Sequence, residues 1–304
     1  MLNHNYDFNE IRRLSERSAW RLEDVVGPDK RLDFARPFMP ESLARTEELT
    51  FLSAAEQRTL NQIRGHSYLH IFIVFEEFVV PYLLDDVRKA VADTEEPLRA
   101  LLQFANEETK HTQVFKQFQR DFREGFPVDC ALIGPASQIG GAVRDHHPLA
   151  VGLLILSTEW VTQAHYLQSV RDDQALDPQF KNLLKYHWIE EAQHAKLDTL
   201  IVEKLAAALS PEQRADALEQ YLALGTLFDG GFARQAELDV DTLERAIGRS
   251  LAPAEREQAL RGQHQAYRYT FLGLAMAHPK FSEVLSALDP DFARRVAQLA
   301  PTFC

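Results

Sequence analysis

Two copies of a Glu-x-x-His motif are the residues in this sequence best suited to chemistry. Glu108 and His111 form the first copy, in NEETKHTQVF, and Glu191 and His194 form the second, in HWIEEAQHAKLD. Residues three apart lie on one face of a helix, so each pair can present a carboxylate and an imidazole to one metal ion. A single copy is weak evidence, because a helix-rich chain has many charged residues, but two copies carry more weight.

Each motif follows a glutamate that lies within an apolar segment. The segment HIFIVFEEFVVPYLL contains the adjacent Glu76 and Glu77, and LAVGLLILSTEWVTQ contains Glu159. A carboxylate in an apolar segment is costly unless it is paired or bound to a cation. The spacing from Glu76 to Glu108 equals that from Glu159 to Glu191, at 32 residues. This repeat indicates that the chain carries two equivalent half-sites.

The combined residue types predict a site for two metal ions. One glutamate from each of two helices, with a Glu-x-x-His motif from each of the other two, is the ligand set of carboxylate-bridged dimetal bundles. Four carboxylates and two imidazoles can neutralise two divalent ions and leave positions open for O2. Mixed oxygen and imidazole ligands suit iron or manganese. We therefore predict two iron ions, with manganese as the alternative and O2 as a co-substrate.

The ligand from the first helix could be Glu76 or Glu77. On a helical wheel, Glu76 lies in the middle of the apolar face with Phe72 and Ile73, whereas Glu77 lies nearer its edge. The likeness of Glu77-Phe-Val to Glu159-Trp-Val favours Glu77 instead. We favour Glu76 and keep Glu77 as the alternative.

His187 is a further candidate on the fourth helix. It precedes Glu191 by four residues and His194 by seven, so the three side chains project along one stripe. His187 is either a polar neighbour of the site, a surface histidine, or an additional ligand that gives one metal an extra nitrogen.

Four long stretches with helical periodicity position these residues. They cover about 53–92, 94–125, 148–171 and 177–209, and residues 126–147 interrupt the pattern with proline and glycine. The interruption predicts a long crossover between the second and third helices. One long crossover is typical of ferritin-like bundles, whereas simple up-down bundles use short loops.

The segments outside these helices are expected to belong to the same domain. Residues 1–50 are polar and predict a short helix and a proline-containing arm. Residues 210–304 predict additional C-terminal helices, broken around Gly230-Gly231, Pro253 and Pro279. We therefore predict an all-α protein with one ferritin-like domain over residues 1–304, in which residues 53–209 form the dimetal core.

Composition excludes several other classes of protein. The net charge is −12, which disfavours binding to the nucleic-acid backbone. Two cysteines, Cys130 and Cys304, are too few for a disulfide framework or a thiolate metal site. The N-terminus has no apolar signal segment, and no apolar run reaches the roughly 20 residues of a membrane span. We expect a cytoplasmic protein without nucleic-acid or membrane partners.

The stretch from Glu159 through HWIEEAQH resembles the AurF-type diiron N-oxygenases, a family that includes p-aminobenzoate N-oxygenase. The resemblance covers about residues 60–205. The family pattern is Glu, Glu-x-x-His, Glu and His-x-x-x-Glu-x-x-His, which implies His187 as a ligand. The chain departs from the family pattern at the residue before each motif glutamate, which is Glu107 or Glu190 here and usually aspartate in the family. A side chain at this position is expected to form a hydrogen bond with a metal-bound histidine. The implied ligands are Glu76, Glu108, His111, Glu159, His187, Glu191 and His194.

The resemblance implies an oxygenase that inserts oxygen into an amine nitrogen of a small-molecule substrate. An external electron donor and a homodimer are expected with it. The same ligands would also suit C–H hydroxylation or desaturation. A third interpretation is iron storage without turnover, but the long segment after residue 210 argues against it. A fourth is a purely structural helical protein. Residues that could line the substrate pocket are Phe72, Phe75, Phe104 and Trp160, with Tyr68, Tyr166 and Tyr186 undecided.

Overall fold

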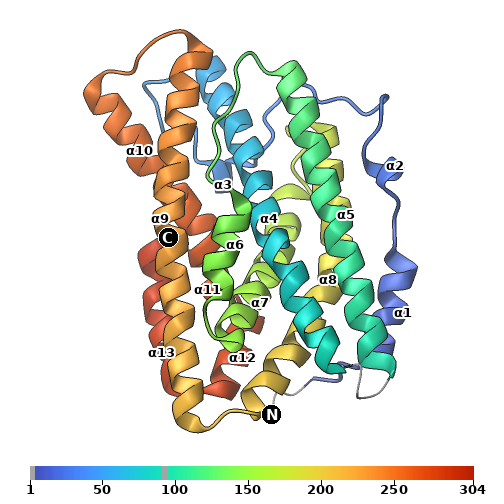
Figure 1. Cartoon of the computed structure of the whole chain (residues 1–304). Coiled ribbons are helices and arrows are strands. Elements are labelled where there is room, and N and C mark those ends of the chain that lie inside the picture. The colour runs from blue at the N-terminus through green and yellow to red at the C-terminus, as the bar shows by residue number, and fades with distance from the viewer. Residues whose placement is uncertain (1–3, 91–94) are drawn as a thin grey trace.

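Four long helices form the centre of the computed structural model, which describes residues 4–90 and 95–304 and is helical without strands in those ranges (Figure 1). The first helix packs on the second and the third packs on the fourth, with the crossover between the two pairs. The predicted all-α bundle with one long crossover is therefore confirmed. The expected end of the first helix near residue 92 and the expected start of the second at Thr94 lie outside the described residues. The four helices are α4 (Ala54–Ala90), α5 (Glu95–Gly125), α7 (Pro148–His165) and α8 (Pro178–Ala207).

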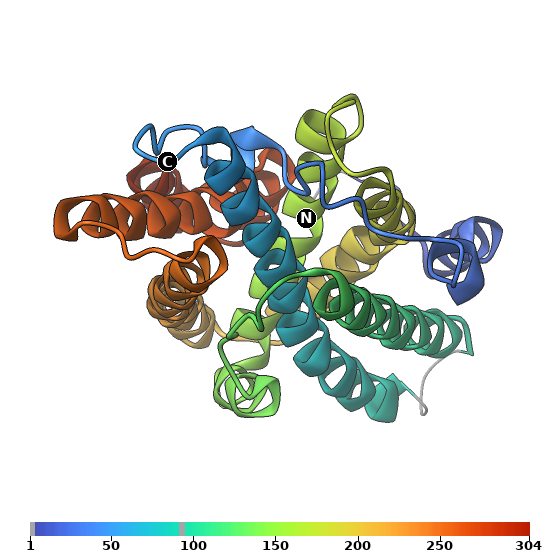
Figure 2. The ribbon, with the colours of Figure 1, turned by 90° about the horizontal axis from the view of Figure 1, so that it is seen from above.

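The first two N-terminal helices and a set of C-terminal helices flank the bundle on opposite sides (Figure 2). At the N-terminal end, α1 packs on α5 and α8, and at the other side α9 packs on α4 and α7. The crossover contains a helix that the sequence pattern did not indicate. The N-terminal and crossover helices are α1 (Phe8–Ser18), α2 (Leu22–Val25), α3 (Glu41–Ala44) and α6 (Ala136–Arg144). The C-terminal elements are α9 (Pro211–Ile247), α10 (Pro253–Arg268), η2 (Tyr269–Gly273), α11 (Leu274–Met276), α12 (Pro279–Leu288), α13 (Pro290–Leu299) and η3 (Ala300–Phe303).

Helix starts follow the capping residues in the sequence. Ser53 and Glu56 form a capping box at the start of α4. Asp177 caps α8 by accepting a hydrogen bond from the Phe180 amide, with proline at the next position. Ser210 caps α9 in the same way. The Asp177 cap fixes where α8 begins, and therefore the height at which the candidate residues of that helix lie in the bundle.

The expected break at Gly230-Gly231 is wrong. Helix α9 runs without interruption from Pro211 to Ile247. Two glycines cost such a helix only about 1 kcal/mol each relative to alanine. The buried face of α9, with Leu224, Phe228 and Phe232 against the core, outweighs that cost. The breaks before Pro253 and Pro279 are confirmed, since each proline begins a helix.

Helix α7 continues into a π-helical turn, η1 (Tyr166–Val170). The amide of Arg171 donates to the carbonyl of Tyr166 at 2.8 Å, five residues back. The sequence pattern does not show this turn, because one extra residue barely changes the apolar periodicity. Such turns are frequent at functional sites, and η1 begins seven residues after Glu159.

Buried apolar side chains from the N-terminal segment, the bundle and the C-terminal helices form one cluster. We propose from this continuity that the chain folds as a single domain. Among the described residues, one helical stretch, Ala54–Arg88 of α4, is long and apolar enough to cross a membrane by length and composition, but 72% of its most apolar window is buried inside the protein. Burial of that kind is typical of a core helix.

Gly152 allows α7 to approach Tyr82 closely. A β-carbon at Gly152 would lie 2.4 Å from the Tyr82 hydroxyl oxygen. We expect Gly152→Ala to destabilise the protein by about 1–3 kcal/mol through overpacking. In a Tyr82→Phe background, which loses only the 3.3 Å hydrogen bond to the Pro148 carbonyl, the same change should cost much less. Denaturant unfolding of the four variants tests this, and equal costs in both backgrounds would refute it.

Candidate metal centre

All seven predicted ligands are buried and converge from the four bundle helices. Each of their side chains belongs to a residue that is at most 6% exposed. Glu76 lies on α4, Glu159 lies on α7, and α5 and α8 supply the two motifs with His187. Glu77 lies outside the cluster, because its partly exposed carboxylate pairs with Lys116 at 2.9 Å.

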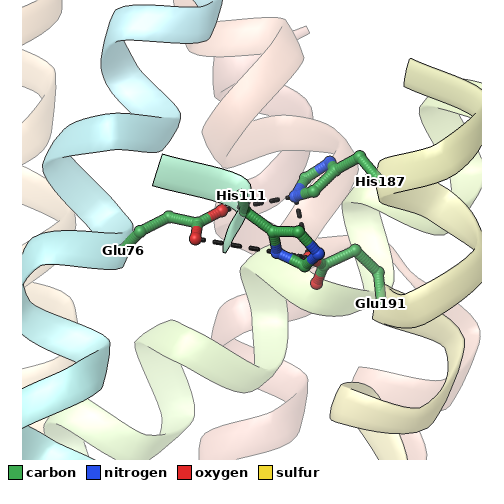
Figure 3. Close-up of side chains that lie close together, drawn as sticks. All are labelled: Glu76, His111, His187 and Glu191. Carbon is green, nitrogen blue, oxygen red and sulfur yellow. Dashed lines mark ion pairs between the residues drawn. The ribbon is translucent and has the colours of Figure 1, made fainter. Parts of the chain in front are cut away.

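The first group of side chains contains Glu76, His111, His187 and Glu191, whose potential ligand atoms all lie within 4.8 Å of one another. The Nε2 atom of His187 lies 3.3 Å from Glu76 Oε1 and 2.7 Å from Glu191 Oε1. The Nδ1 atom of His111 lies 3.6 Å from Glu76 Oε2. Figure 3 shows these four side chains pointing toward one another from α4, α5 and α8. The geometry therefore suits one cation with two carboxylate and two imidazole ligands.

The second group contains Glu108, His111, Glu191 and His194 and meets the same 4.8 Å limit. The Nδ1 atom of His194 lies 2.8 Å from Glu108 Oε1 and 3.4 Å from Glu191 Oε2. The two oxygens of Glu191 thus face different groups, since Oε1 is the atom nearest His187. A carboxylate in this position can bridge two cations.

Glu159 completes the set from the side of α7. It lines the same cavity as Glu76, Glu108 and Glu191, although it belongs to neither group as defined by the 4.8 Å limit. Burial and the neighbouring Glu191 and Glu108 carboxylates raise its pKa well above the usual value. A metal ion would replace the proton that this environment favours.

The seven side chains pass a direct test of fit to metal ions. A buried polar atom normally has a hydrogen-bond partner. Each of the seven residues has one buried atom without a well-formed hydrogen bond, and six of the seven residues belong to the two groups, where such atoms could coordinate cations. The atoms are Glu76 Oε2, Glu108 Oε1, His111 Nδ1, Glu159 Oε2, His187 Nε2, Glu191 Oε1 and His194 Nδ1.

The two glutamates that precede the motifs orient the histidines of the opposite helix. The Nε2–H of His111 donates to Glu190 Oε2 at 2.9 Å, and the Nε2–H of His194 donates to Glu107 Oε2 at 2.9 Å. This confirms the expected hydrogen bond to a site histidine. Glu190 reaches from α8 to His111 on α5, and Glu107 reaches from α5 to His194 on α8. Holding the proton on Nε2 leaves Nδ1 of each ring free to bind a metal.

The N-terminal segment contacts Glu107 directly and Glu190 through Lys110, and the sequence indicated neither contact. Ser15 on α1 donates to Glu107, whereas Lys110 on α5 donates both to Glu190 and to the Trp20 carbonyl. The ammonium group of Lys110 also lies 4.0 Å from the ring centre of Trp20. Ser15 lies 92 residues from Glu107 in the chain, and no local motif marks such a contact.

The buried charges raise the pKa values of several side chains in the cluster. Burial favours neutral imidazoles, but the Glu76, Glu190 and Glu191 carboxylates outweigh it and raise the pKa of His111 well above its usual value. His194 is raised in the same way by Glu191, Glu108 and Glu107. Burial and the Glu76 and Glu191 carboxylates raise the pKa of Glu108 as well.

Metal binding is therefore expected to release protons, since histidine and glutamate ligands bind cations in their deprotonated forms. Because the raised pKa values of His111 and His194 favour their protonated forms in the metal-free protein, the affinity for Zn(II) or Mn(II) should increase as the pH rises from 6 to 8. Calorimetry in buffers with different ionisation enthalpies measures the protons released. An apparent enthalpy that is the same in all buffers would contradict this expectation.

Two small adjoining cavities lie at the cluster. The inner cavity has a volume of about 10 Å³, which is room for about one water molecule, and it contacts Phe72 and Phe75. The outer cavity, also of about 10 Å³, contacts Tyr68 and Tyr166. Phe104 and Trp160 line neither of these two cavities. Phe104 stacks on His194 with ring centres 4.0 Å apart, Trp160 stacks on His278, and Tyr186 contacts Trp20 instead.

The fold and the cluster define a ferritin-like helical bundle with the residue set of a dimetal centre. The sequence profile of the p-aminobenzoate N-oxygenase AurF family matches residues 8–244. The match covers more than half of the chain, and the protein belongs to this family.

Solved structures with related helix arrangements include variants of an R2-like ligand-binding oxidase. One, with an aerobically reconstituted Mn/Fe cofactor, has 13% sequence identity and a TM-score of 0.46, covering 89% of this chain and 99% of the other. Another, with an Fe/Fe cofactor, has 12% identity and a TM-score of 0.44, covering 88% and 94%. Similarity at this level is too low to transfer a property to this protein. A comparison with curated protein sequences gives no match.

Proposed function

We propose that this protein is a non-haem diiron oxygenase that uses O2 to oxygenate the nitrogen of an amine substrate. The observation that carries the proposal is the set of seven buried side chains, each with an atom free for coordination, in two groups that share His111 and Glu191. Membership in the AurF family supports the reaction type. Manganese remains the alternative metal, because the ligand types suit both.

We infer from the two groups that Glu76, His187 and His111 would hold one ion and that Glu108 and His194 would hold the other, with Glu191 between them. Glu159 belongs to neither group but lines the same cavity, and we assign it to the second ion. Two reduced iron ions in these positions supply the activation of O2. The protein contributes the ligands, their orientation and the exclusion of water.

The chain's own residues perform the remaining tasks. Glu190 and Glu107 hold the Nε2 protons of His111 and His194 and so keep both rings in position. Phe72, together with the other apolar side chains of the inner cavity, keeps bulk water from the reacting nitrogen. The net reaction converts R–NH2, O2, two electrons and two protons to R–NHOH and water, so an external electron donor is required.

Loading with two equivalents of Fe(II) without oxygen, followed by addition of ¹⁸O2, an electron donor and an arylamine, tests the proposal. We expect a transient visible absorption band and an N-hydroxylated product that carries ¹⁸O. Label on carbon, or a desaturated product, would identify C–H oxidation instead. Iron that is stored without any organic product would refute oxygenation.

The assembly and location of the protein are further proposals. We propose a homodimer in the cytoplasm, as expected from the sequence, with no nucleic-acid or membrane partner. Light scattering during gel filtration measures the mass directly, and a monomer at micromolar concentration would refute the dimer.

A further inference from the structure

We propose that the substrate binds first in an apolar groove between the crossover and α9, and that it reaches the metal centre by displacing the stacked rings of Phe228 and Phe75. The occupant of the groove is a small molecule, or the part of one, that carries no charge. This inference deepens the proposed function, on which it rests for the identity of the occupant as the substrate. It adds a binding site outside the metal centre.

The metal centre itself has no room for a substrate. The inner cavity holds about one water molecule, and the outer cavity beside it holds no more. A molecule with even one ring is much larger than a water molecule. Such a molecule has to bind elsewhere until side chains beside the cluster move.

A groove of about 410 Å³ lies between the crossover and α9, which are neighbours in both views of the molecule (Figures 1 and 2). Its volume falls within the roughly 300–1,000 Å³ that is typical of sites for small molecules. Among the described residues, its lining contains no charged side chain. The lining consists of Ile133 and Ile139 from the crossover and Thr226, Leu227, Phe228 and the glycine pair 230–231 from α9.

The polar groups at the groove already have partners within the protein. The Thr226 hydroxyl donates to a carbonyl of its own helix at 3.2 Å. The Ile133 amide donates to Gln235 at 2.9 Å, and the Ile133 carbonyl accepts from His70 Nε2–H at 2.6 Å. Asp229, which lies between the lining residues of α9, pairs with two side chains of α10 instead. A charged group in the groove would therefore lose its hydration without gaining a partner, so the occupant is held by apolar contact.

The rings of Phe228 and Phe75 separate this groove from the metal centre. Phe228 lines the groove, whereas Phe75 lines the inner cavity. The two rings are stacked, with centres 4.8 Å apart and an angle of 9° between their planes. Phe75 directly precedes Glu76, which is one of the seven site residues. Rotation of the two rings out of this stack would join the groove to the inner cavity.

The adjacent glycines of α9 keep the groove open. A β-carbon at Gly230 would meet no atom within 4 Å, and one at Gly231 would meet only Ile133, at 3.8 Å. Side chains at these positions would therefore project into the groove and not into the core. Alanine stabilises an exposed position in a helix better than glycine does. Space for an occupant is thus a physical reason for glycine at both positions.

Binding of 4-methylaniline to the zinc-loaded protein tests the location of the site without turnover. With isotope-labelled isoleucine and leucine methyl groups, we expect nuclear Overhauser effects between the probe and Ile133, Ile139 and Leu227. Effects to Leu184 at the outer cavity instead, or the absence of saturable binding, would overturn the inference. The ¹⁸O2 experiment separately decides whether the iron centre oxygenates, so failure of the groove leaves the proposed function standing.

Replacement of Gly230 by leucine fills the groove. Gly230→Leu should weaken binding of 4-methylaniline at least about tenfold, the factor that corresponds to a loss of roughly 60 Å² of apolar contact. Gly141→Leu is the matched control, because Gly141 also lies in a helix with no atom within 4 Å of a β-carbon, but outside the groove. Its affinity should remain that of the unmodified protein, and equal affinities in the two variants would contradict the proposed site. Groove methyl signals that shift with protein concentration and not with the probe would assign the groove to a contact between two copies, and would also overturn the inference.

Replacement of Phe228 by alanine tests the passage to the metal centre. In the protein loaded with paramagnetic Co(II), the relaxation of the probe's protons depends on the inverse sixth power of their distance from the ions. At saturating probe, Phe228→Ala should raise this relaxation several-fold, because the ring of the probe can then enter the inner cavity. Phe232→Ala is the matched control, since Phe232 stacks on Tyr267 and lines neither the groove nor the inner cavity. Equal relaxation in the two variants would refute the passage, and Phe228→Leu with Phe232→Leu makes the same comparison if an alanine variant does not fold.

Discussion

Replacement of Glu191 by alanine is expected to abolish stable binding of both iron ions. The two carboxylate oxygens face different groups, 2.7 Å from His187 Nε2 and 3.4 Å from His194 Nδ1. Removal of this side chain takes one ligand from each ion and leaves their mutual repulsion uncompensated. Iron per chain, measured after anaerobic loading and desalting, should fall from about two to below about 0.2, as expected for a bridging ligand of a dimetal bundle.

The matched control for this experiment is Glu77→Ala. Glu77 adjoins Glu76 in the sequence but pairs with Lys116 away from the cluster. This variant should retain the full iron content of the unmodified protein. Equal iron loss in both variants would indicate general damage, and full iron content in Glu191→Ala would show that Glu191 does not bridge.

Replacement of Glu190 by leucine is expected to weaken metal binding by about 10- to 100-fold, the usual effect of removing a partner that orients a ligand. Glu190 accepts the Nε2 proton of His111 and also pairs with Lys110. Without it, the imidazole is no longer held with Nδ1 toward the cluster, and Lys110 loses its countercharge. Competition with a chelator of known affinity measures the change.

Glu190→Gln is the graded control for that variant, because its amide oxygen can still accept the proton of His111. We expect its affinity to lie between those of the unmodified protein and Glu190→Leu. An affinity in Glu190→Leu equal to that of the unmodified protein would show that the hydrogen bond has no role in metal binding.

The sequence contains enough to bring the seven candidate residues together because their signals are local. A glutamate within an apolar helix, such as Glu159, has to lie in the interior, and three-residue spacing puts Glu108 and His111 on one face. The choice between Glu76 and Glu77 needed the structure. Neighbouring residues of a helix differ by a rotation of about 100°, so the two side chains lie on adjacent faces. The helical wheel favoured Glu76, whereas the likeness to Glu159-Trp-Val favoured Glu77.

Other features depend on contacts between distant segments and were not predictable. The crosswise pairing of Glu190 with His111 and of Glu107 with His194 follows from the approach of α5 and α8. The support of Glu107 by Ser15 depends on where α1 docks. The continuity of α9 through Gly230 reflects packing that outweighs local helix propensity.

A crystal structure of the iron-loaded protein, with anomalous diffraction data collected on both sides of the iron absorption edge, tests the central claim most directly. We expect two anomalous peaks inside the bundle. One should lie against Glu76 and His187 and the other against Glu108 and His194, with Glu191 contacting both. A single peak, peaks held by other residues, or no peak in protein that retains its fold would contradict a dimetal centre at these residues.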